Sequence, residues 1–168
     1  MAMEGRETNG VKTEGELPSQ VAERIGVNYA NQAGLEHKKT NGQFFTPIQI
    51  AELMADLVDS NSEHLRILDP GCGTAILSCS LIESLVKKNS RLSSIVLVLF
   101  EIDEQLTPSI KEIMISLEVW LKSHKVSFSY SLKREDFVLS NAQYLDGNHN
   151  LFFGIPDRFD IIISNPPY

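Results

Sequence analysis

The sequence predicts an α/β protein whose parallel sheet has four strands in the spatial order 3-2-1-4. Residues 94–100 and 161–163 are uninterrupted apolar segments, as expected for strands covered on both faces. Amphipathic helical segments separate most of the strands, as right-handed crossovers between parallel strands require. Residues 125–132 instead alternate apolar and polar side chains, which is typical of a strand at the edge of a sheet.

Length and composition indicate a soluble domain of the reducing cytoplasm. The chain has 168 residues, enough for one domain with a sizeable core. Its net charge of −7 argues against a nucleic-acid clamp that depends on bulk electrostatics. The two cysteines, Cys72 and Cys79, indicate neither a disulfide framework nor a zinc site. The polar N-terminus is not a signal peptide, and no apolar segment is long enough to span a membrane.

A tail and a helix are predicted first. Residues 1–16 are charged and rich in glycine and threonine, and we expect them to form a mobile tail. Val21, Ile25 and Tyr29 then recur every four residues and predict a helix over residues 18–33.

A second helix is predicted to begin within "QFFTP". Thr46 suits an N-cap, Pro47 suits the first helical position, and Gln49 lies where a capping box has its polar partner. The predicted buried face consists of Leu53, Met54, Leu57 and Val58. Taken alone, "QFFTP" indicates only a helix cap and two core phenylalanines.

The remaining elements alternate between strand and helix. Residues 66–88 predict a short strand, a glycine-rich turn and a helix, and residues 94–100 predict the second strand. A further helix begins at Thr107, a polar stretch covers residues 140–158, and the fourth strand lies within residues 159–164. The apolar stripes of these two helices are Ile76, Leu77, Leu81, Ile82 and Leu85, and Ile110, Ile113, Met114, Leu117 and Leu121.

The strand order places a switch point between the first and fourth strands. Ligands of open parallel sheets bind beyond the carboxyl ends of the strands at such a point. The motifs "DPGCGT" and "NPPY" follow these two strands. We therefore expect the two motifs to face each other.

The loop "DPGCGT" joins the first strand to its helix. Gly71 and Gly73 allow a ligand to approach the backbone closely, and the helix N-terminus offers N–H groups. Ile76 fills the third position of the dinucleotide-binding fingerprint, so a pyrophosphate fits poorly. Asp69 can hold a cationic amino group. This motif alone supports a ligand site and a purely structural turn equally.

Acidic residues follow the second and third strands. Glu101 lies where a carboxylate accepts hydrogen bonds from vicinal ribose hydroxyls. The alternative role is an acidic flank for the next helix, for which Asp103 and Glu104 are better placed. Glu101 and the glycine loop together favour a nucleoside ligand. Asp136 and Phe137 can bind an exocyclic amine and pack on an adenine, or they can belong to an ordinary loop.

The motif "NPPY" at residues 165–168 is the most specific signal. An Asn-Pro-Pro turn presents an amide oxygen beside a backbone carbonyl, and proline lacks a competing N–H. Two such acceptors suit a planar amine. Tyr168 adds a ring on which a base can stack, an interaction worth about 1–3 kcal/mol. A chance turn after a buried strand explains this motif far less well.

With these residues, the chain resembles the amino-methylating DNA methyltransferases that use S-adenosyl-L-methionine, in particular the N6-adenine group of restriction–modification systems. The resemblance covers residues 42–168, where "QFFTP", "DPGCGT", "FEID", "DF" and "NPPY" follow the order of that family's motifs. The cofactor-binding residues it implies are Phe44, Phe45, Thr46, Pro47, Asp69, Pro70, Gly71, Cys72, Gly73, Glu101, Ile102, Asp136 and Phe137. The catalytic residues it implies are Asn165, Pro166, Pro167 and Tyr168.

The resemblance implies a Rossmann-like class I methyltransferase fold and a metal-free reaction. The Asn165 side-chain oxygen and the Pro166 carbonyl would hold the N6 amine of an adenine flipped out of the duplex, on which Tyr168 would stack. Glu101 would bind the cofactor ribose, and Ile102 would lie against its adenine. One departure is Ala75, where family members often have a third glycine.

Three rival functions remain open. Protein methyltransferases that modify the glutamine of release factors also carry "NPPY", but "QFFTP" and "DPG" resemble the DNA enzymes more. A cytosine-N4 enzyme more often has Ser or Asp before the two prolines. The third rival is a non-catalytic, cofactor-binding half of a split enzyme.

A complete domain of this family continues after "NPPY" with further helices, strands and a target-recognition region. We therefore expect a helix and cofactor-motif loop at residues 17–45 and a partial methyltransferase domain at residues 46–168. Such a fragment would lack DNA specificity and turnover by itself. The partners implied are double-stranded DNA, bound through the missing region, and specificity or restriction subunits.

Overall fold

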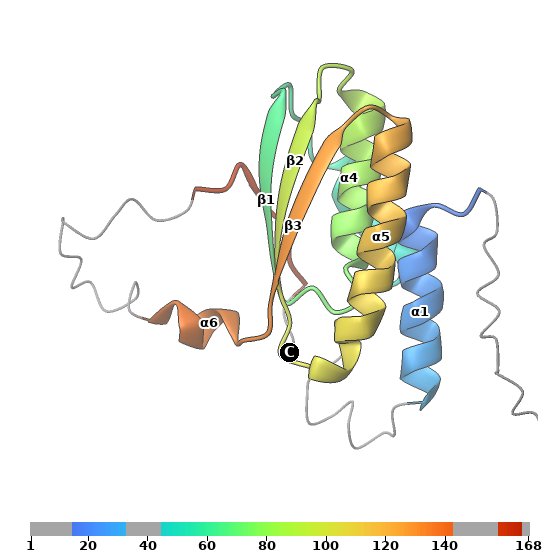
Figure 1. The fold of residues 1–168 in the computed structure, drawn as a ribbon, viewed down its shortest axis with the longest axis vertical. Helices are drawn as coiled ribbons and strands as arrows, with labels where there is room; N and C mark the ends of the chain where they lie inside the picture. Colours follow the sequence, from blue (N-terminus) through green and yellow to red (C-terminus); the bar gives the residue numbers. More distant parts are fainter. Residues whose placement is uncertain (1–14, 33–44, 143–157, 166–168) are drawn as a thin grey trace, which may run out of the picture.

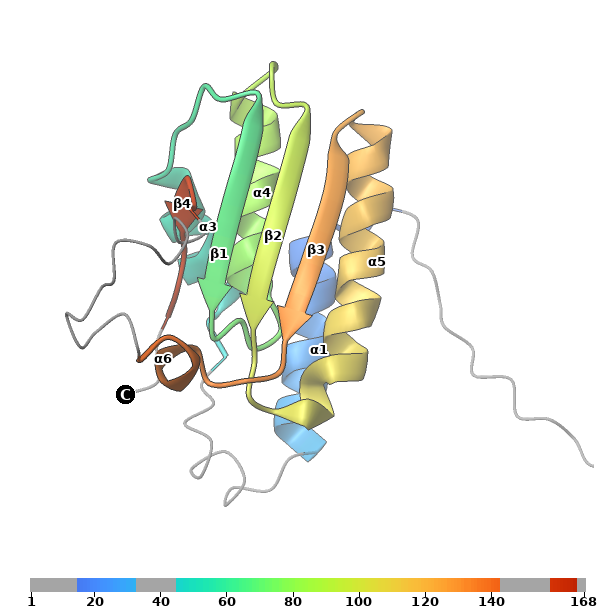
Figure 2. The same ribbon diagram turned by 60° about the vertical axis from the view of Figure 1, so that its left-hand side comes forward.

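The structure, a computed structural model, describes residues 15–32, 45–142 and 158–165. Within these residues the centre is a four-stranded parallel sheet of order β3-β2-β1-β4, which confirms the predicted order (Figure 1). The strands are β1 (His64–Pro70), β2 (Ser94–Phe100), β3 (Ser127–Lys133) and β4 (Ile161–Ile162). The arrowheads in Figure 2 show that the carboxyl ends of β1, β2 and β3 lie at one edge of the sheet.

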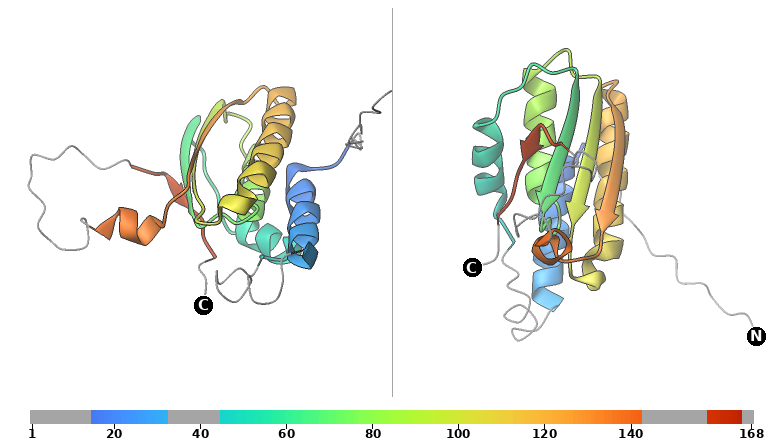
Figure 3. Two further views of the ribbon diagram at one scale, coloured as in Figure 1. Left: turned by 60° about the horizontal axis from the view of Figure 1, so that its bottom comes forward. Right: turned by 90° about the vertical axis from the view of Figure 1, so that its left-hand side faces the viewer.

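Helices cover one face of this sheet in two layers. The helices of these layers are α1 (Pro18–Gln32), α3 (Ile48–Asp56), α4 (Ile76–Lys88) and α5 (Thr107–Ser123), with a 3₁₀ turn η1 (Glu104–Leu106). The short helix α6 (Phe137–Ser140) lies on the opposite face, where Phe137 packs against the sheet. Figures 1 and 3 show α4 and α5 beside the sheet and α1 on their far side. Helix α3 packs against α4. Among the described residues, no helix is long and apolar enough to cross a membrane.

The main core lies between the sheet and the helices α4 and α5. The inward side chains of β1 and β2 are almost completely buried: Leu65, Ile67, Ile95, Leu97 and Leu99. The stripes predicted for α4 and α5 are buried as well. Since each fully buried aliphatic side chain contributes about 1.5–3 kcal/mol, this interface supplies most of the hydrophobic stabilisation.

The opposite face of the sheet, called here the open face, is covered differently. Leu68, Val98 and Phe100 form a small buried cluster there, against which Phe137 and Phe159 pack. These contacts lie near the carboxyl ends of the strands. Toward the other end of the same face, the strand positions are exposed or half-buried. The prediction that the central strands are covered along both faces is therefore wrong for part of their length.

Strand β4 is also more exposed than predicted. It comprises two residues, and Ile162 is 64% exposed, so the expectation of a fully buried fourth strand is wrong. Only Ile163, which follows it, is buried, and its N–H donates to the Leu68 carbonyl at 3.0 Å. An apolar run shows that a strand is suited to burial, whereas burial itself depends on which segments pack against it.

The edge strand β3 and helix α1 agree with the sequence. Phe128 and Leu132 of β3 pack against the main core, and Tyr130 is 37% exposed. On α1, Val21 and Ile25 are buried and Tyr29 packs against the same core.

Helix α1 is anchored on α4 through its first turn. The backbone N–H and the hydroxyl of Ser19 each donate to a different oxygen of the buried Glu83, both at 2.8 Å. These bonds satisfy an amide at a helix N-terminus that would otherwise lack a partner. Of the predicted tail, residues 1–14 lie outside the described residues, and Glu16 forms an ion pair with Arg24 at 3.1 Å.

Helix α3 begins one residue later than predicted. Pro47 occupies its N-cap position, and no side chain caps the helix, so the prediction of Thr46 as N-cap is wrong. The Thr46 hydroxyl instead accepts a hydrogen bond from Asn165 Nδ2 at 3.0 Å. A bond over this sequence separation cannot be read from a local capping pattern.

The buried face of α3 also differs from the prediction. Ala51 and Ala55 face the core, whereas Leu53 and Leu57 are 59% and 79% exposed. Met54 and Val58 are half-buried against the core. The small alanines allow α3 to lie close to α4, and this close packing turns the larger side chains outward.

Candidate functional site

The predicted site residues converge at the carboxyl ends of β1, β2 and β4. The described ones lie in the segment before α3, on the loop after β1, on the segment after β2, at the start of α6 and just after β4. As predicted, the glycine loop and Asn165 follow the two neighbouring strands β1 and β4. Phe44, Pro166, Pro167 and Tyr168 lie outside the described residues.

The loop after β1 has an unusual backbone. Gly71 and Gly73 have φ angles of 115° and 53°, and Ala75 has a φ of 56° immediately before α4. L-residues with a side chain rarely adopt this left-handed region. Ala75 is the position at which the resembling family often has glycine, and here its methyl group is fully buried.

The loop is fastened to the end of β2. The N–H groups of Gly71 and Cys72 both donate to the Phe100 carbonyl, at 3.0 and 2.8 Å. The Gly73 N–H donates to Glu101 Oε2 at 2.8 Å. The sequence suggested that loop amides would be available to a ligand, but these three bind within the protein. They hold the glycine loop and Glu101 in one arrangement.

Glu101 is positioned by backbone amides on both sides. Its Oε2 accepts from Gly73 N–H and its Oε1 from Asp103 N–H, both at 2.8 Å. Burial raises the pKa of Glu101, and these two hydrogen bonds oppose that rise. A carboxylate offers about four lone-pair directions, so Glu101 can still accept bonds from two hydroxyl groups.

Asp69 is enclosed beneath the loop. Its Oδ2 accepts a bond from Ser78 Oγ at 2.7 Å, but its Oδ1 is buried without a partner among the described residues. Burial raises the pKa of Asp69 to about 7, the Ser78 bond opposes this, and Glu101 adds to it. An orphaned carboxylate oxygen in such a place suits a cationic group nearby.

The cysteine of the loop has no sign of reactivity. Cys72 is buried, and burial raises the pKa of its thiol well above the usual range. Across residues 15–32, 45–142 and 158–165, no group of three or more His, Cys, Asp or Glu side chains could hold a metal ion.

The residues predicted to contact an adenine follow the carboxyl ends of the neighbouring strands β2 and β3. Phe137 meets Phe100 edge-to-face, with ring centroids 5.0 Å apart, and Ile102 is 60% exposed. Asp136 Oδ1 accepts bonds from the N–H groups of Val138 and Leu139, so it caps the short helix α6. This short helix was not predicted from the sequence.

The segment before α3 connects the two halves of the site. The Phe45 ring would lie 3.5 Å from a Cβ atom at Gly73, and it meets the Tyr29 ring edge-on at 5.9 Å. The next residue, Thr46, holds Asn165. Phe45 and Thr46 therefore link the glycine loop to the end of β4.

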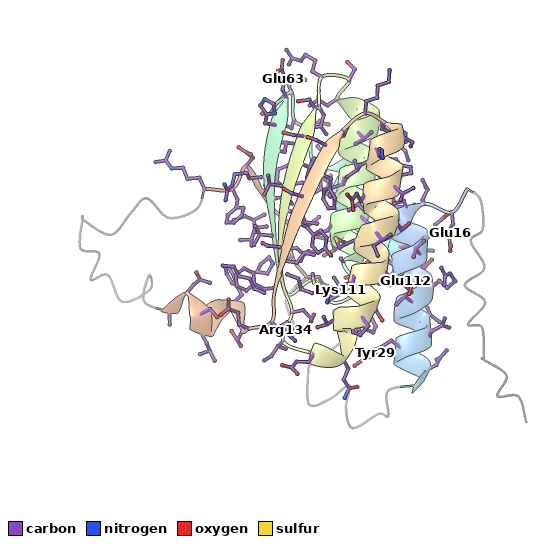
Figure 4. The ribbon with its side chains drawn as sticks, in the orientation of Figure 1. Glu16, Tyr29, Glu63, Lys111, Glu112 and Arg134 are labelled. Atoms are coloured by element: carbon purple, nitrogen blue, oxygen red, sulfur yellow. The ribbon has the colours of Figure 1, made fainter. Side chains whose placement is uncertain are left out.

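Two residues at the site were not predicted. The Tyr29 hydroxyl donates to Asp103 Oδ2 at 2.5 Å, and Figure 4 shows Tyr29 near the end of α1, toward the edge where the strands end. The spacing of Tyr29 predicted only a place in an apolar stripe, and the position of Asp103 predicted a role as an acidic flank of the next helix. The sequence feature that could have indicated this role is the hydroxyl group of Tyr29, the last residue of that stripe.

Comparison with known proteins supports the prediction drawn from these residues. Residues 19–168 match the family model described as N-6 DNA methylase. The chain belongs to this family. S-Adenosyl-L-methionine is the family's cofactor, as the sequence predicted.

Individual relatives agree with the family. The chain is 30% identical over 135 residues to the type II methyltransferase M.BsuBI of Bacillus subtilis, covering 80% of this chain and 26% of the relative. It is 27% identical over 158 residues to the type II methyltransferase M.AccI of Acinetobacter calcoaceticus, covering 94% and 23%. This chain therefore spans about a quarter of the length of these relatives.

A solved structure shows the same fold. A putative class I S-adenosylmethionine-dependent methyltransferase from Listeria monocytogenes superposes with a TM-score of 0.56 at 20% identity, covering 92% of this chain and 41% of that protein. The predicted Rossmann-like class I methyltransferase sheet is thereby confirmed.

Proposed function

We propose that this chain provides the cofactor-binding part and the catalytic asparagine of an enzyme that methylates the N6 amine of adenine in DNA. The observation that carries this proposal is the bond between Asn165 and Thr46, because it ties the asparagine of "NPPY" to the segment whose Phe45 packs against Gly73. Membership of the N-6 DNA methylase family and the two type II relatives support DNA as the substrate.

The residues of the loop fit the cofactor. Asp69 offers an unpartnered buried carboxylate oxygen to the cofactor's cationic methionine end, and Glu101 retains two acceptor directions for ribose hydroxyls. Phe137, Asp136 and Ile102 form the adenine side of this site. S-Adenosyl-L-methionine supplies an electrophilic methyl group when bound.

Asn165 acts on the amine that receives the methyl group. Because its Nδ2 donates to Thr46, the amide oxygen is the polar atom left for the substrate. That oxygen and the Pro166 carbonyl accept the N6 hydrogens, which keeps the nitrogen lone pair directed at the methyl group. Tyr168 stacks on the target base after it has left the duplex.

The chain is proposed to require further protein for turnover. It spans 26% and 23% of the two type II relatives, so a target-recognition region would be a large additional part. The net charge of −7 agrees with a DNA-binding surface that lies elsewhere. The cytoplasm is the proposed location, and specificity or restriction subunits are the proposed partners.

An allelic replacement in the host tests the function with every natural partner present. We expect Asn165→Ala to abolish N6-methyladenine at one recurrent DNA sequence, as mapped by single-molecule sequencing. Glu104→Ala, an exposed residue near Glu101, serves as the control and should leave the methylation pattern intact. Unchanged methylation in Asn165→Ala would contradict the proposal.

An assay with the purified chain separates the rival functions. We expect no transfer of labelled methyl from the cofactor to duplex DNA by the chain alone. Transfer to the glutamine of a release factor would favour the protein methyltransferase. Turnover on DNA comparable to that of a complete enzyme would overturn the expectation that further protein is needed.

A further inference from the structure

Helix α1 approaches the ribose acid without contributing to any of the recognised motifs. Its Tyr29 hydroxyl donates to Asp103 Oδ2 at 2.5 Å, across 74 positions of sequence. Figure 4 shows Tyr29 extending from α1 toward the beginning of α5. The bond therefore connects the outer helical layer to the segment that leaves β2.

Asp103 is in turn bonded directly to Glu101. The Asp103 N–H donates to Glu101 Oε1 at 2.8 Å, and Asp103 Oδ1 accepts from the Gln105 N–H at 2.9 Å. Asp103 is 6% exposed and Glu101 is 7% exposed. Any rotation of Asp103 would therefore move its backbone N–H, which is one of the two amides that hold the Glu101 carboxylate.

The helix that carries Tyr29 is itself fixed. Its first turn is anchored by the two bonds from Ser19 to Glu83, and its body packs against α4 and α5. Near the other end, the Tyr29 ring meets Phe45, which in turn lies over Gly73. Tyr29 is therefore a rigid point to which the Glu101–Asp103 segment is tied.

We propose that Tyr29 is a positioning residue for the cofactor ribose, which acts by holding Asp103 and, through it, the Glu101 carboxylate. This inference rests on the proposed role of Glu101 as the ribose acid. It assigns to α1 a function in binding as well as in the core. Glu101 has two acceptor directions left for ligand hydroxyls, and their orientation depends on the amides of Gly73 and Asp103.

The chemistry of Tyr29 suits this role. Burial and the bond to Asp103 raise the pKa of the phenol, so it remains a donor throughout the physiological range. A hydrogen bond between a hydroxyl and a carboxylate is short and stronger than one between neutral groups. A phenylalanine would keep the ring that contacts Phe45 and would remove the hydroxyl that donates to Asp103.

Calorimetric titration with two ligands tests the proposal. The ligands are S-adenosylhomocysteine and its analogue without the ribose 2′-hydroxyl. We expect Tyr29→Phe to weaken binding of S-adenosylhomocysteine about three- to tenfold, the range set by one hydrogen bond. The loss should be distinctly smaller for the 2′-deoxy analogue, since it lacks one of the hydroxyls that Glu101 orients.

Matched variants make the result specific. Tyr130→Phe also removes one phenol oxygen, but on the edge strand, and should leave both affinities unchanged. Asp103→Ala removes the acceptor and should reproduce the ligand dependence of Tyr29→Phe. The double variant should bind no more weakly than Asp103→Ala, because both changes break the same bond.

The outcomes separate this inference from the proposed function. If wild type binds and Tyr29→Phe binds equally well, or loses affinity equally for both ligands, the positioning role is overturned and the cofactor site stands. If wild type binds neither ligand, the cofactor-binding role proposed for this chain fails, and the inference fails with it.

Discussion

The two halves of the candidate site are held in very different ways. On the cofactor side, Glu101 and the glycine loop are buried and fastened by amide bonds to the end of β2. On the acceptor side, β4 has two residues, and Ile162 is 64% exposed. Asn165 is held there by its bond to Thr46.

This difference indicates which half is ready to bind its ligand. The cofactor side lies between central strands whose inward side chains are almost inaccessible to solvent, so its geometry is set by the main core. The acceptor side lies on an edge strand with few bonds, and edges of this kind pair readily with further protein. We infer that the cofactor half is preorganised and that additional protein completes the acceptor half.

The largest expected effect is in hydrogen exchange. The amides of Asp160 and Ile163, which donate to the carbonyls of Arg66 and Leu68, should exchange about 1,000-fold faster than amides inside β2, because local opening costs least where burial is least. Exchange measured residue by residue by NMR checks this. Equal protection in β2 and β4 would remove the contrast between the two halves.

Glu101→Ala should have the next largest effect, weakening cofactor binding about 100-fold. Two hydrogen bonds to a charged group are lost, and together they are worth about 3 kcal/mol at the lower end of the usual range, which corresponds to a factor on the order of 100. Calorimetry with S-adenosyl-L-methionine measures the change, and Glu104→Ala, an exposed carboxylate nearby, is the control. If both variants bind alike, Glu101 does not contact the ribose.

Asp69 should make cofactor binding depend on pH. Because its pKa is about 7 without ligand, a cationic ligand must displace a proton at lower pH, so affinity should fall up to tenfold per pH unit below about 7. Calorimetry between pH 6 and 8 measures this slope. Asp69→Asn should flatten it, and an unchanged slope in that variant would assign the titration to another group.

The same carboxyl should affect the stability of the ligand-free chain. Its pKa is raised from 3.8 to about 7 in the folded state, so the folded chain binds more protons than the unfolded chain between these values. Stability should therefore fall as pH rises through this window and level off above it. Thermal unfolding of wild type and Asp69→Asn at pH 5 and 8 compares the two, and a wild type that gains stability over this range would contradict the assignment.

The smallest effect should come from Thr46→Val. Loss of the hydroxyl removes the bond to Asn165, worth about 1 kcal/mol, while the volume of the side chain is kept. The side-chain amide resonances of Asn165 should shift and sharpen in Thr46→Val and remain near their wild-type positions in Thr46→Ser. Identical spectra in all three proteins would show that Thr46 does not orient the amide.

Several features could be predicted because they depend on local periodicity. The stripes of α1, α4 and α5 and the alternation of β3 each follow from the geometry of a single element. The strand order was predicted because one strand has the alternating pattern of an edge strand, whereas the other three are uniformly apolar. The family was predicted from motifs that are short and contiguous in sequence, and the match of residues 19–168 to the family model confirms it.

Other features failed because they depend on which segments meet. Thr46 has the side chain of an N-cap, yet it binds Asn165 because β4 brings that residue close. Leu53 and Leu57 have the spacing of a buried stripe, yet the close approach of Ala51 and Ala55 to the core turns them outward. The spacing of apolar residues alone does not show which of two apolar faces of a helix will be the buried one.

The sequence by itself determined the class of fold, the strand order and the family of this chain. Helical and strand periodicities and contiguous motifs are properties of neighbouring residues, so they can be recognised without any knowledge of tertiary contacts. Only the tertiary structure decided that Tyr29 reaches Asp103, that an Asp69 oxygen has no partner among the described residues, and that β4 is exposed. Each of these depends on segments far apart in the chain, and their meeting is fixed by how the helices and the sheet pack together.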